Sequence, residues 1–362
     1  MRKWLWVAIV GLVLLGGIVK AGLPVPGLLN EVLEPRAEDV SFAGLPVEEA
    51  EPELVWQLFL PWSKDGLGHG EKYLGAFGLG MYVDAAPPAR LVVGPGDIIA
   101  VQDGWDTRTR LYDREGRFLG LREGYPLGFT PNGGLITFSP VVRRYDPSGN
   151  LLWERDPHAE AKRMLGLPES SPTELVGGYS TAFASPWGDV YCSVRIGRYT
   201  AGTCLSPDEQ GVELPQWVQT DEFHVGVIYD ADGKLVRFVS EGIPGGLVFT
   251  PSGTAFATAV PEDNMWAHRE FQIRDGQFTL RRTIRLPNYS IFAVGQDGSV
   301  VARDPGLPTP FTVYREGSRK AVRFILPGKH MDADTDFEGH IYSMEVQQDG
   351  LVIACWKWPV PQ

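Results

Sequence analysis

Four side chains that can bind a metal ion or a proton alternate along one short segment near the end of the chain. They are His330, Asp332, Asp334 and Asp336, and alternate residues of a β-strand project from the same face. Carboxylates stacked on one face repel one another unless a cation or hydrogen-bond donors compensate, and oxygen ligands suit Ca²⁺. His330, Asp332 and Asp334 are therefore candidate metal ligands, although Phe337 stands where a standard calcium loop has glycine.

The same residues also fit a purely structural interpretation. Asp334 and Asp336 would cap the turn before Gly339, while Asp332 would point to water or to a neighbouring arginine. Alternate residues of one straight strand cannot wrap an ion that needs about six to eight oxygen ligands. We therefore expect Asp332 at a central channel, Asp336 in the turn and no tightly bound metal. No cofactor is expected on this interpretation, and calcium is the alternative.

Aromatic residues beside acids form a second kind of candidate site. The segment 195–224 carries Tyr199, Trp217 and five acidic residues, and long loops in compact domains are either functional or solvated insertions. Trp105 precedes Asp106, a combination found on sugar-binding surfaces, although a tryptophan buried between sheets is the more common alternative. These four residues are the predicted binding site for a protein or carbohydrate ligand at a loop face.

Short motifs of known catalytic sites are absent from the sequence. The six histidines are scattered, and no nucleophile stands beside a base at a recognisable spacing. Ser185 lies in the turn-like stretch ASPWG, which lacks the G-x-S-x-G elbow of hydrolases. The sequence therefore favours a non-catalytic function over an enzymatic one.

Composition excludes two broad classes of protein. The 362 residues include 33 Lys and Arg against 45 Asp and Glu, which gives a formal net charge of -12, so nucleic acid is not an expected partner. With 43% hydrophobic residues the chain can bury a large core and is not disordered as a whole. The 43 glycines and 29 prolines are typical of many short strands joined by tight turns.

The N-terminal residues predict where the protein is located. Arg2 and Lys3 precede an uncharged stretch that Lys20 closes, which is the order of an export signal. Residues 1–21 are predicted to be a membrane anchor that leaves the rest of the chain outside the cytoplasm, or alternatively a signal that is cleaved to release a secreted protein. Residues 22–52 are rich in proline and acid and are predicted to be an extended, solvated linker.

Export would also decide the state of the cysteines. An exported chain meets an oxidising compartment, so Cys192 and Cys204, which lie in one repeat unit, are predicted to form a disulfide, with two unlinked thiols as the alternative. Cys355 lies in an apolar run, 351–356, and is predicted to be a small buried hydrophobic residue.

One pattern organises the rest of the chain: an alternating apolar run, a turn with glycine and a second alternating run, which together predict a β-hairpin. It occurs six times, with turn glycines 38 to 65 residues apart, a spacing typical of propeller blades. The six turn glycines are Gly96, Gly134, Gly188, Gly253, Gly298 and Gly339.

A second hairpin completes most of the units. Gly116, Gly149 and Gly233 each end a Tyr-Asp-x-x-Gly turn, in which glycine tolerates the positive φ that a side chain disfavours. The sixth unit is one strand short, and the segment 54–61 (LVWQLFLP) matches the missing outer strand. We therefore predict that 54–61 pairs with 351–358 and closes a ring, which removes exposed sheet edges. One helix is predicted, at 158–165.

One motif carries a family resemblance. Residues 66–71 (GLGHGE), followed by Tyr73 and then by the hairpins and the Tyr-Asp-x-x-Gly turns, resemble the NHL-repeat class of six-bladed β-propellers. The resemblance covers 53–362 and implies the fold more than an activity. Related six-bladed lactonases carry calcium at the channel mouth, so the resemblance also implies an enzymatic alternative.

Together these patterns predict an all-β protein: a six-bladed β-propeller over 53–362, closed by 54–61 and preceded by an N-terminal hydrophobic helix and an acidic linker. The predicted function is a membrane-tethered, extracytoplasmic binding or scaffolding module with an unknown ligand. The alternative is a calcium-dependent hydrolase or lyase with its site at the central channel.

Overall fold

The computed structural model describes residues 38–62, 90–102, 108–167, 181–202, 216–257, 259–262, 265–303, 309–328 and 330–361. Asp39–Gln362 form one compact unit and Met1–Glu38 another. The predicted anchor, residues 1–21, most of the predicted linker and the motif at 66–73 lie outside the described residues. Within the described part of the chain, no helix is long and apolar enough to cross a membrane.

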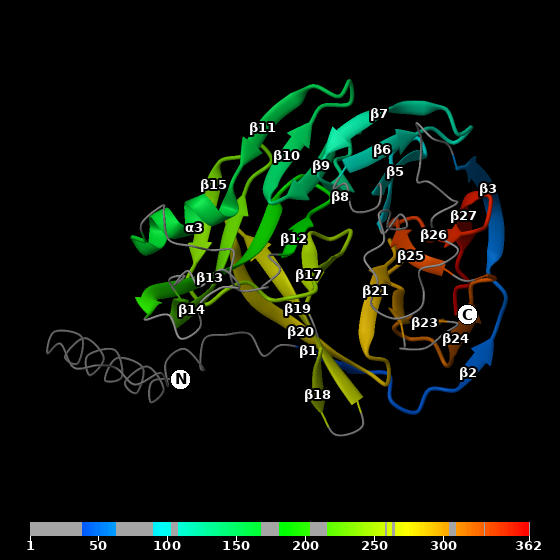
Figure 1. The fold of residues 1–362 in the computed structure, drawn as a ribbon. Helices are drawn as coiled ribbons and strands as arrows, with labels where there is room; N and C mark the ends of the chain where they lie inside the picture. Colours follow the sequence, from blue (N-terminus) through cyan, green and yellow to red (C-terminus); the bar gives the residue numbers. More distant parts are fainter. Residues whose placement is uncertain are drawn as a thin grey trace, which may run out of the picture. The chain divides into compact units, whose positions relative to one another are not determined.

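Six sheets, here called blades 1 to 6, follow one another along the folded unit (Figure 1). Blade 1 consists of β4 (Leu91–Gly94), β5 (Ile98–Gln102), β6 (Arg108–Tyr112) and β7 (Phe118–Glu123). Blade 2 consists of β8 (Tyr125–Phe129), β9 (Leu135–Ser139), β10 (Val141–Tyr145) and β11 (Leu151–Arg155). Blade 3 consists of β12 (Thr181–Ala184), β13 (Val190–Gly202), β14 (Gln216–Tyr229) and β15 (Leu235–Val239).

The other three blades each recruit a strand from the N-terminal part of the unit. Blade 4 consists of β16 (Val248–Phe249), β17 (Thr254–Phe256), β18 (Val260–Glu262), β19 (Met265–Arg274) and β20 (Gln277–Leu286), with β1 (Glu38–Ser41) against β20. Blade 5 consists of β21 (Ser290–Val294), β22 (Val300–Arg303), β23 (Pro310–Tyr314) and β24 (Ala321–Ile325), with β2 (Val47–Glu49) parallel to β24. Blade 6 consists of β25 (His330–Thr335), β26 (His340–Val346), β27 (Gly350–Lys357) and β3 (Glu53–Pro61).

The six predicted hairpins are the first two strands of the six blades. Their turn glycines adopt positive φ in five blades, for example 73° at Gly96 and 80° at Gly253. In blade 2 the residue with positive φ is Gly133, at 83°, and not the predicted Gly134. Local turn chemistry therefore predicts these hairpins correctly, with one residue of error in one turn.

Hydrophobic residues fill the spaces between neighbouring blades. Six buried clusters occur, and each joins two blades that are adjacent in the circle: 1 with 2, 2 with 3, 3 with 4, 4 with 5, 5 with 6, and 6 with 1. Each sheet therefore buries both of its faces against its neighbours, and the last blade packs on the first. The architecture is an all-β, six-bladed propeller.

Strand β3 closes the ring from the opposite end of the sequence. It pairs antiparallel with β27, with Leu60 opposite Leu351 and Glu53 opposite Lys357, and Figure 1 shows the two strands side by side in blue and red. Leu60 is only 3% exposed and belongs to the cluster between blades 6 and 1. The pairing of 54–61 with 351–358 that the sequence predicts is present.

The prediction that residues 22–52 form a solvated linker is wrong for residues 39–52. Strands β1 and β2 extend blades 4 and 5, and Phe42 is buried against Tyr314 with ring centroids 5.3 Å apart. The acidic residues, expected to be solvated, instead meet basic residues in or next to the outer strands. The ion pairs are Asp39 with Arg285 (3.1 Å), Glu48 with Lys320 (2.6 Å) and Glu49 with Arg323 (4.0 Å).

One helix, α3 (Pro157–Leu165), follows blade 2 and confirms the helix predicted at 158–165. Asp156 caps its N-terminus by accepting hydrogen bonds from the backbone N–H groups of His158 (2.9 Å) and Ala159 (3.0 Å). Gly166 ends the helix with φ 67°, the conformation that glycine adopts without steric cost. Ala161 is buried in the cluster between blades 2 and 3.

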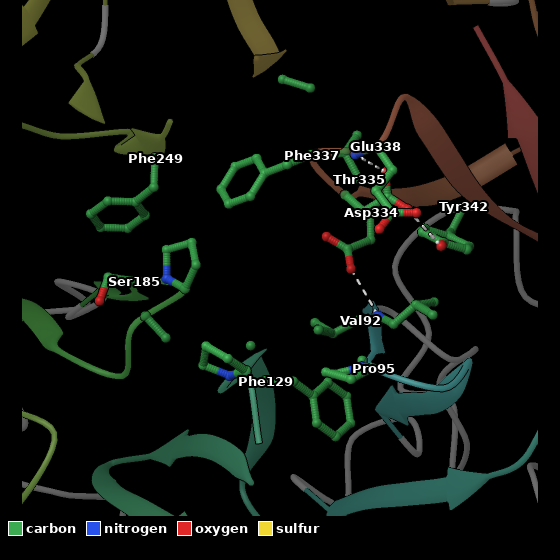
Figure 2. A pocket seen from close by; sticks show the side chains of 18 of the residues that line it. Val92, Pro95, Phe129, Ser185, Phe249, Asp334, Thr335, Phe337, Glu338 and Tyr342 are labelled. Carbon is green, nitrogen blue, oxygen red and sulfur yellow. Dashed lines mark hydrogen bonds between the residues drawn. The ribbon is translucent and has the colours of Figure 1, made fainter. Parts of the chain in front are cut away.

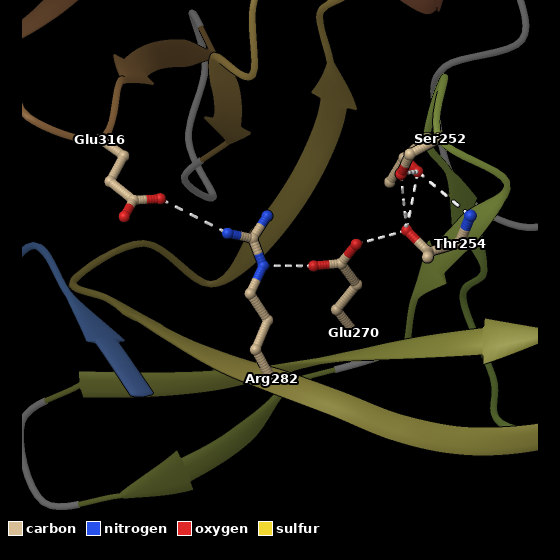
Figure 3. A network of polar contacts seen from close by, with 6 residues as sticks. Ser252, Thr254, Glu270, Arg282 and Glu316 are labelled. Carbon is tan, nitrogen blue, oxygen red and sulfur yellow. Dashed lines mark hydrogen bonds and ion pairs between the residues drawn. The ribbon is translucent and has the colours of Figure 1, made fainter. Parts of the chain in front are cut away.

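Blades 4 and 5 are also joined by a polar network around one buried glutamate (Figure 3). Glu270 of β19 is 2% exposed and accepts hydrogen bonds from Thr254 and Arg282. Arg282 also forms an ion pair with Glu316 of blade 5 at 3.5 Å. Because a buried carboxylate without a partner is strongly destabilising, Arg282 holds Glu270 in place and connects it to the neighbouring blade.

The Tyr-Asp-x-x-Gly turns place their glycines against neighbouring blades. In the turn of blade 3, Asp230 Oδ1 accepts hydrogen bonds from the backbone N–H groups of Asp232 (3.0 Å) and Lys234 (2.8 Å). Gly233 has φ 74°, and a Cβ there would lie 2.6 Å from the ring of Trp153 in blade 2. That ring cannot move freely, because its Nε1–H donates to the carbonyl of Ala231 (3.0 Å).

We predict that Gly233→Ala destabilises the protein more than Gly253→Ala does. Both glycines have positive φ, which costs a side chain about 1–2 kcal/mol, but a Cβ at Gly253 meets nothing within 4 Å. The clash with Trp153 adds roughly 1–3 kcal/mol of overpacking. Urea denaturation of the two variants measures the difference, and equal losses of unfolding free energy would contradict the packing of Trp153 on this turn.

Candidate functional site

The first strands of all six blades surround a central cavity of about 690 Å³ (Figure 2). Every blade supplies wall residues from its innermost strand or the turn that follows it. The lining side chains include Val92, Asp97, Leu127, Phe129, Thr130, Ser185, Leu247, Phe249, Phe292, Gln296, Asp334, Asp336, Phe337, Glu338 and Tyr342. The cavity is therefore the channel of the propeller.

Polar and apolar groups are unevenly distributed around this wall. Blades 2 to 5 supply mainly apolar side chains. Among the described lining residues of these blades, the polar ones are Thr130, Ser185 and Gln296. The four carboxylates, Asp97, Asp334, Asp336 and Glu338, come from blades 1 and 6. No lysine, arginine or histidine occurs among the described residues that line the cavity. One side of the channel is acidic, and the opposite side is apolar.

The side chains of Asp332 and Asp334, here called the acidic row of β25, face blade 1 instead of the channel axis. Asp332 Oδ2 accepts a hydrogen bond from the backbone N–H of Leu91 (2.7 Å), and Asp334 Oδ2 accepts one from Val93 (2.8 Å). Strand β4 pairs with β5 on one edge only, so its inner edge presents unpaired backbone donors. The two carboxylates satisfy these donors and fasten blade 6 to blade 1.

The expectation that Asp332 lies at the channel is therefore incorrect. A blade stands with its strand edge toward the axis, so the side chains of its innermost strand project toward neighbouring blades. Asp334, further along the strand, is the residue of this row that reaches the cavity wall. Figure 2 shows its carboxylate beside the strand of blade 1.

Burial changes the acidity of both carboxyl groups. Desolvation raises the pKa of Asp334 to about 7, and the nearby charge of Asp332 acts in the same direction. Desolvation also raises the pKa of Asp332, against the opposing effect of its hydrogen bond from Leu91. The carboxyl group of Asp334 lies within the ring, where the residue is only partly exposed. Asp334 therefore changes charge near neutral pH.

Asp336 lies in the turn before Gly339, as the sequence predicts. Its Oδ1 accepts hydrogen bonds from the backbone N–H groups of Glu338 (2.8 Å) and His340 (3.0 Å). Its Oδ2 lies 2.8 Å from His340 Nδ1 and accepts a hydrogen bond from the hydroxyl of Tyr342 (2.9 Å). Asp336 therefore organises the turn and orients the imidazole of His340.

The residues Asp336, Glu338 and His340 do not fit a calcium ion. Ligand atoms of Asp336, Glu338 and His340 lie within 4.8 Å of one another, but both oxygens of Asp336 already accept hydrogen bonds. One of the three groups is an imidazole, whereas Ca²⁺ takes about six to eight oxygens. Of the predicted ligands, Asp332 and Asp334 serve the edge of β4, and the side chain of His330, which is opposite Glu345 in register, is outside the described part of the structure.

The side chains of the predicted loop-face residues lie outside the described part of the structure. Trp105 and Asp106 lie outside the described residues. Tyr199 and Trp217 lie in β13 and β14, where they are opposite Gln219 and Ala201 in register, and only their backbone is described. The segment 195–224, expected to be a long loop, is instead largely a continuation of the β13–β14 hairpin.

The continuous strand also contradicts the predicted disulfide between Cys192 and Cys204. Cys192 is a free thiol and is completely buried in the cluster between blades 2 and 3. Strand β13 runs unbroken from Val190 to Gly202, which places Gly202 roughly 33 Å from Cys192 at about 3.3 Å per residue. The two further residues to Cys204 span only about 7 Å. Cys355 is a buried free thiol, as predicted.

The sequence predicts a central channel, but not the aromatic residues of its wall. Phe129, Phe249 and Phe292 fall in the first strands of predicted hairpins, and in a propeller the first strand of each blade is the innermost. That rule, applied to the six hairpins, would have identified this set of wall residues.

Comparison with known proteins does not assign this chain to a family. A scan of family models and a search of curated proteins find no match to this chain. Among solved structures, the chain is similar to a gluconolactonase from Xanthomonas campestris, with 13% identity and a TM-score of 0.43 over 90% of this chain and 99% of the other. It is also similar to a catalytically inactive virginiamycin B lyase from Staphylococcus aureus in complex with quinupristin, with 11% identity and a TM-score of 0.39 over 84% and 99%. Such distant likenesses do not transfer an activity.

Proposed function

We propose that this protein is a binding module that takes up a small molecule in the central cavity of the propeller. The observation that carries the proposal is the cavity of about 690 Å³ to which all six blades contribute. Ligand sites are typically clefts of about 300–1,000 Å³ with mostly apolar walls and a few placed polar groups. The apolar side chains of blades 2 to 5 and the carboxylates of blades 1 and 6 match this description.

The wider setting of this function rests on the sequence. We propose that residues 1–21 tether the propeller to a membrane or direct its export, with the cavity outside the cytoplasm. The side chains of Trp105, Asp106, Tyr199 and Trp217 are proposed to contact a protein or carbohydrate partner at a loop face. Neither proposal is needed for the cavity to bind its ligand.

Filling the cavity with a larger side chain tests whether it is the binding site. We predict that Ala184→Phe, which adds a ring to the wall supplied by blade 3, weakens the binding of small aromatic fragments at least about tenfold, a loss of about 1.4 kcal/mol. Protein-observed NMR with a set of neutral, anionic and cationic fragments measures the affinities.

The matched control is Val236→Phe, because Val236 is 39% exposed on the outer strand β15. This variant adds the same bulk outside the ring and should bind as the unmodified protein does. If both variants retain the fragments with unchanged affinity, the central cavity is not the site.

A second candidate function is a hydrolase or lyase at the same cavity. Asp334 favours it, because a carboxyl group with a pKa of about 7 in a cavity wall suits a general acid or base at neutral pH. Since the cluster of Asp336, Glu338 and His340 does not fit calcium, this candidate is proposed without a role for the ion. Turnover of any fragment that binds would favour the enzyme over the binding module.

A further inference from the structure

The charged residues of the described cavity wall are all acidic, and some of them have no cationic partner in the described part of the chain. Asp97 is paired with Arg114 at 3.3 Å, and Asp336 is occupied by His340 and Tyr342. Asp334 and Glu338 form no ion pair with any cation in the described part of the chain. The arginine that acts on Asp334 electrostatically is Arg90, which does not line the cavity.

Aromatic rings surround the same space. Phe129 comes from blade 2, Phe249 from blade 4 and Phe292 from blade 5, and Phe337 and Tyr342 from blade 6. Figure 2 shows Phe129, Phe249 and Phe337 around the cavity, with the carboxylate of Asp334 on the adjoining wall. Aromatic faces attract cations through the ring quadrupole, and their area also binds the apolar body of a ligand.

We propose that the ligand of this cavity is an organic cation with an apolar body, such as a substituted ammonium compound. The inference rests on the proposed function, whose site it shares. A carboxylate or phosphate ligand would find no basic side chain on the described wall and would meet like charge at Asp334 and Glu338. A small hydrated metal ion would leave most of the 690 Å³ and the aromatic rings without a role.

The test compares two probes of similar shape and different charge. Calorimetry at pH 8 measures the binding of choline, a permanent cation, and of 3,3-dimethylbutan-1-ol, in which a carbon atom replaces the charged nitrogen. We expect the cation to bind at least about tenfold more tightly, which corresponds to about 1.4 kcal/mol. Ala184→Phe should weaken the binding of both probes.

Substitutions of the two carboxylates then test whether they cause the preference for the cation. Asp334→Asn and Glu338→Gln should each reduce the ratio of the affinity for the cation to the affinity for the neutral probe. Glu338 is exposed, so its variant keeps the test valid if the loss of the Asp334 charge disturbs the ring. Glu154→Gln, on the outer strand β11, is the control and should behave as the unmodified protein does.

The possible outcomes separate this inference from the proposed function. If both probes bind equally and Ala184→Phe weakens both, the cavity is a binding site but the inferred charge preference is wrong. If the cation is preferred but neither acidic substitution changes that preference, the assignment of the carboxylates is wrong. If neither probe binds, the proposed function falls together with this inference.

Discussion

A chain that begins at residue 63 is expected to lose cooperative folding. It lacks β3, which supplies the outer strand of blade 6 along its whole pairing with β27, together with the buried side chain of Leu60. Without β3, the edge of β27 is open and the cluster between blades 6 and 1 loses part of its cover. Burial of one large aliphatic side chain alone contributes about 2–3 kcal/mol, and the lost strand hydrogen bonds add to this.

A chain that begins at residue 52 is the control, because it loses β1 and β2 but keeps β3. Strands β1 and β2 lie outside complete blades, and their ion pairs are exposed and contribute little. The loss of the buried side chain of Phe42 should lower the melting temperature, but with all six blades complete this chain should still unfold cooperatively. Calorimetric scans of both chains give the answer. Similar melting transitions in the two chains would show that β3 does not close the ring.

The second large effect concerns the pH dependence of stability. Folding raises the pKa of Asp334 from 3.8 to about 7, so the folded protein binds this proton more tightly than the unfolded chain does. The contribution to stability is complete below the unfolded value and is lost as pH rises through about 7. For this group alone, unfolding free energy should fall by about 3 kcal/mol between pH 5 and pH 8.

The neutral variant Asp334→Asn isolates this contribution. Burial lowers the pKa of His158 and of His268, so these groups make stability rise with pH toward 6.5 and oppose the effect. Both histidines are present in the variant, and the difference in unfolding free energy between the two proteins therefore reports on Asp334. Relative to the unmodified protein, the variant should become more stable as pH rises. A difference that stays constant from pH 5 to pH 8, or that matches Glu154→Gln, would show that Asp334 is ionised throughout.

Features that depend on neighbouring residues in the sequence were predicted well. A turn glycine such as Gly96 or Gly253 is required by the positive φ of its own turn, and the helix after Asp156 begins and ends at its own capping residues. The pairing of 54–61 with 351–358 is a long-range feature, but the repeat reveals it, because the sixth unit lacks one strand and this segment has the missing pattern.

Features that depend on the arrangement of the blades were not predictable in the same way. The acids of residues 39–49 indicate a solvated segment until the bases of β20 and β24 lie opposite them. Cys192 and Cys204 are close in number, yet the length of β13 separates them in space.

Asp332 and Asp334 show most clearly what the sequence alone could not predict. Alternation correctly places Asp332 and Asp334 on one face of a strand, but it cannot say what that face meets. In the folded ring the face meets the inner edge of β4, where the N–H groups of Leu91 and Val93 need acceptors. The wall of the cavity likewise collects residues from six blades between Val92 and Tyr342. The hairpin pattern can identify the innermost strands, but only the closure of the ring decides what the side chains of those strands meet.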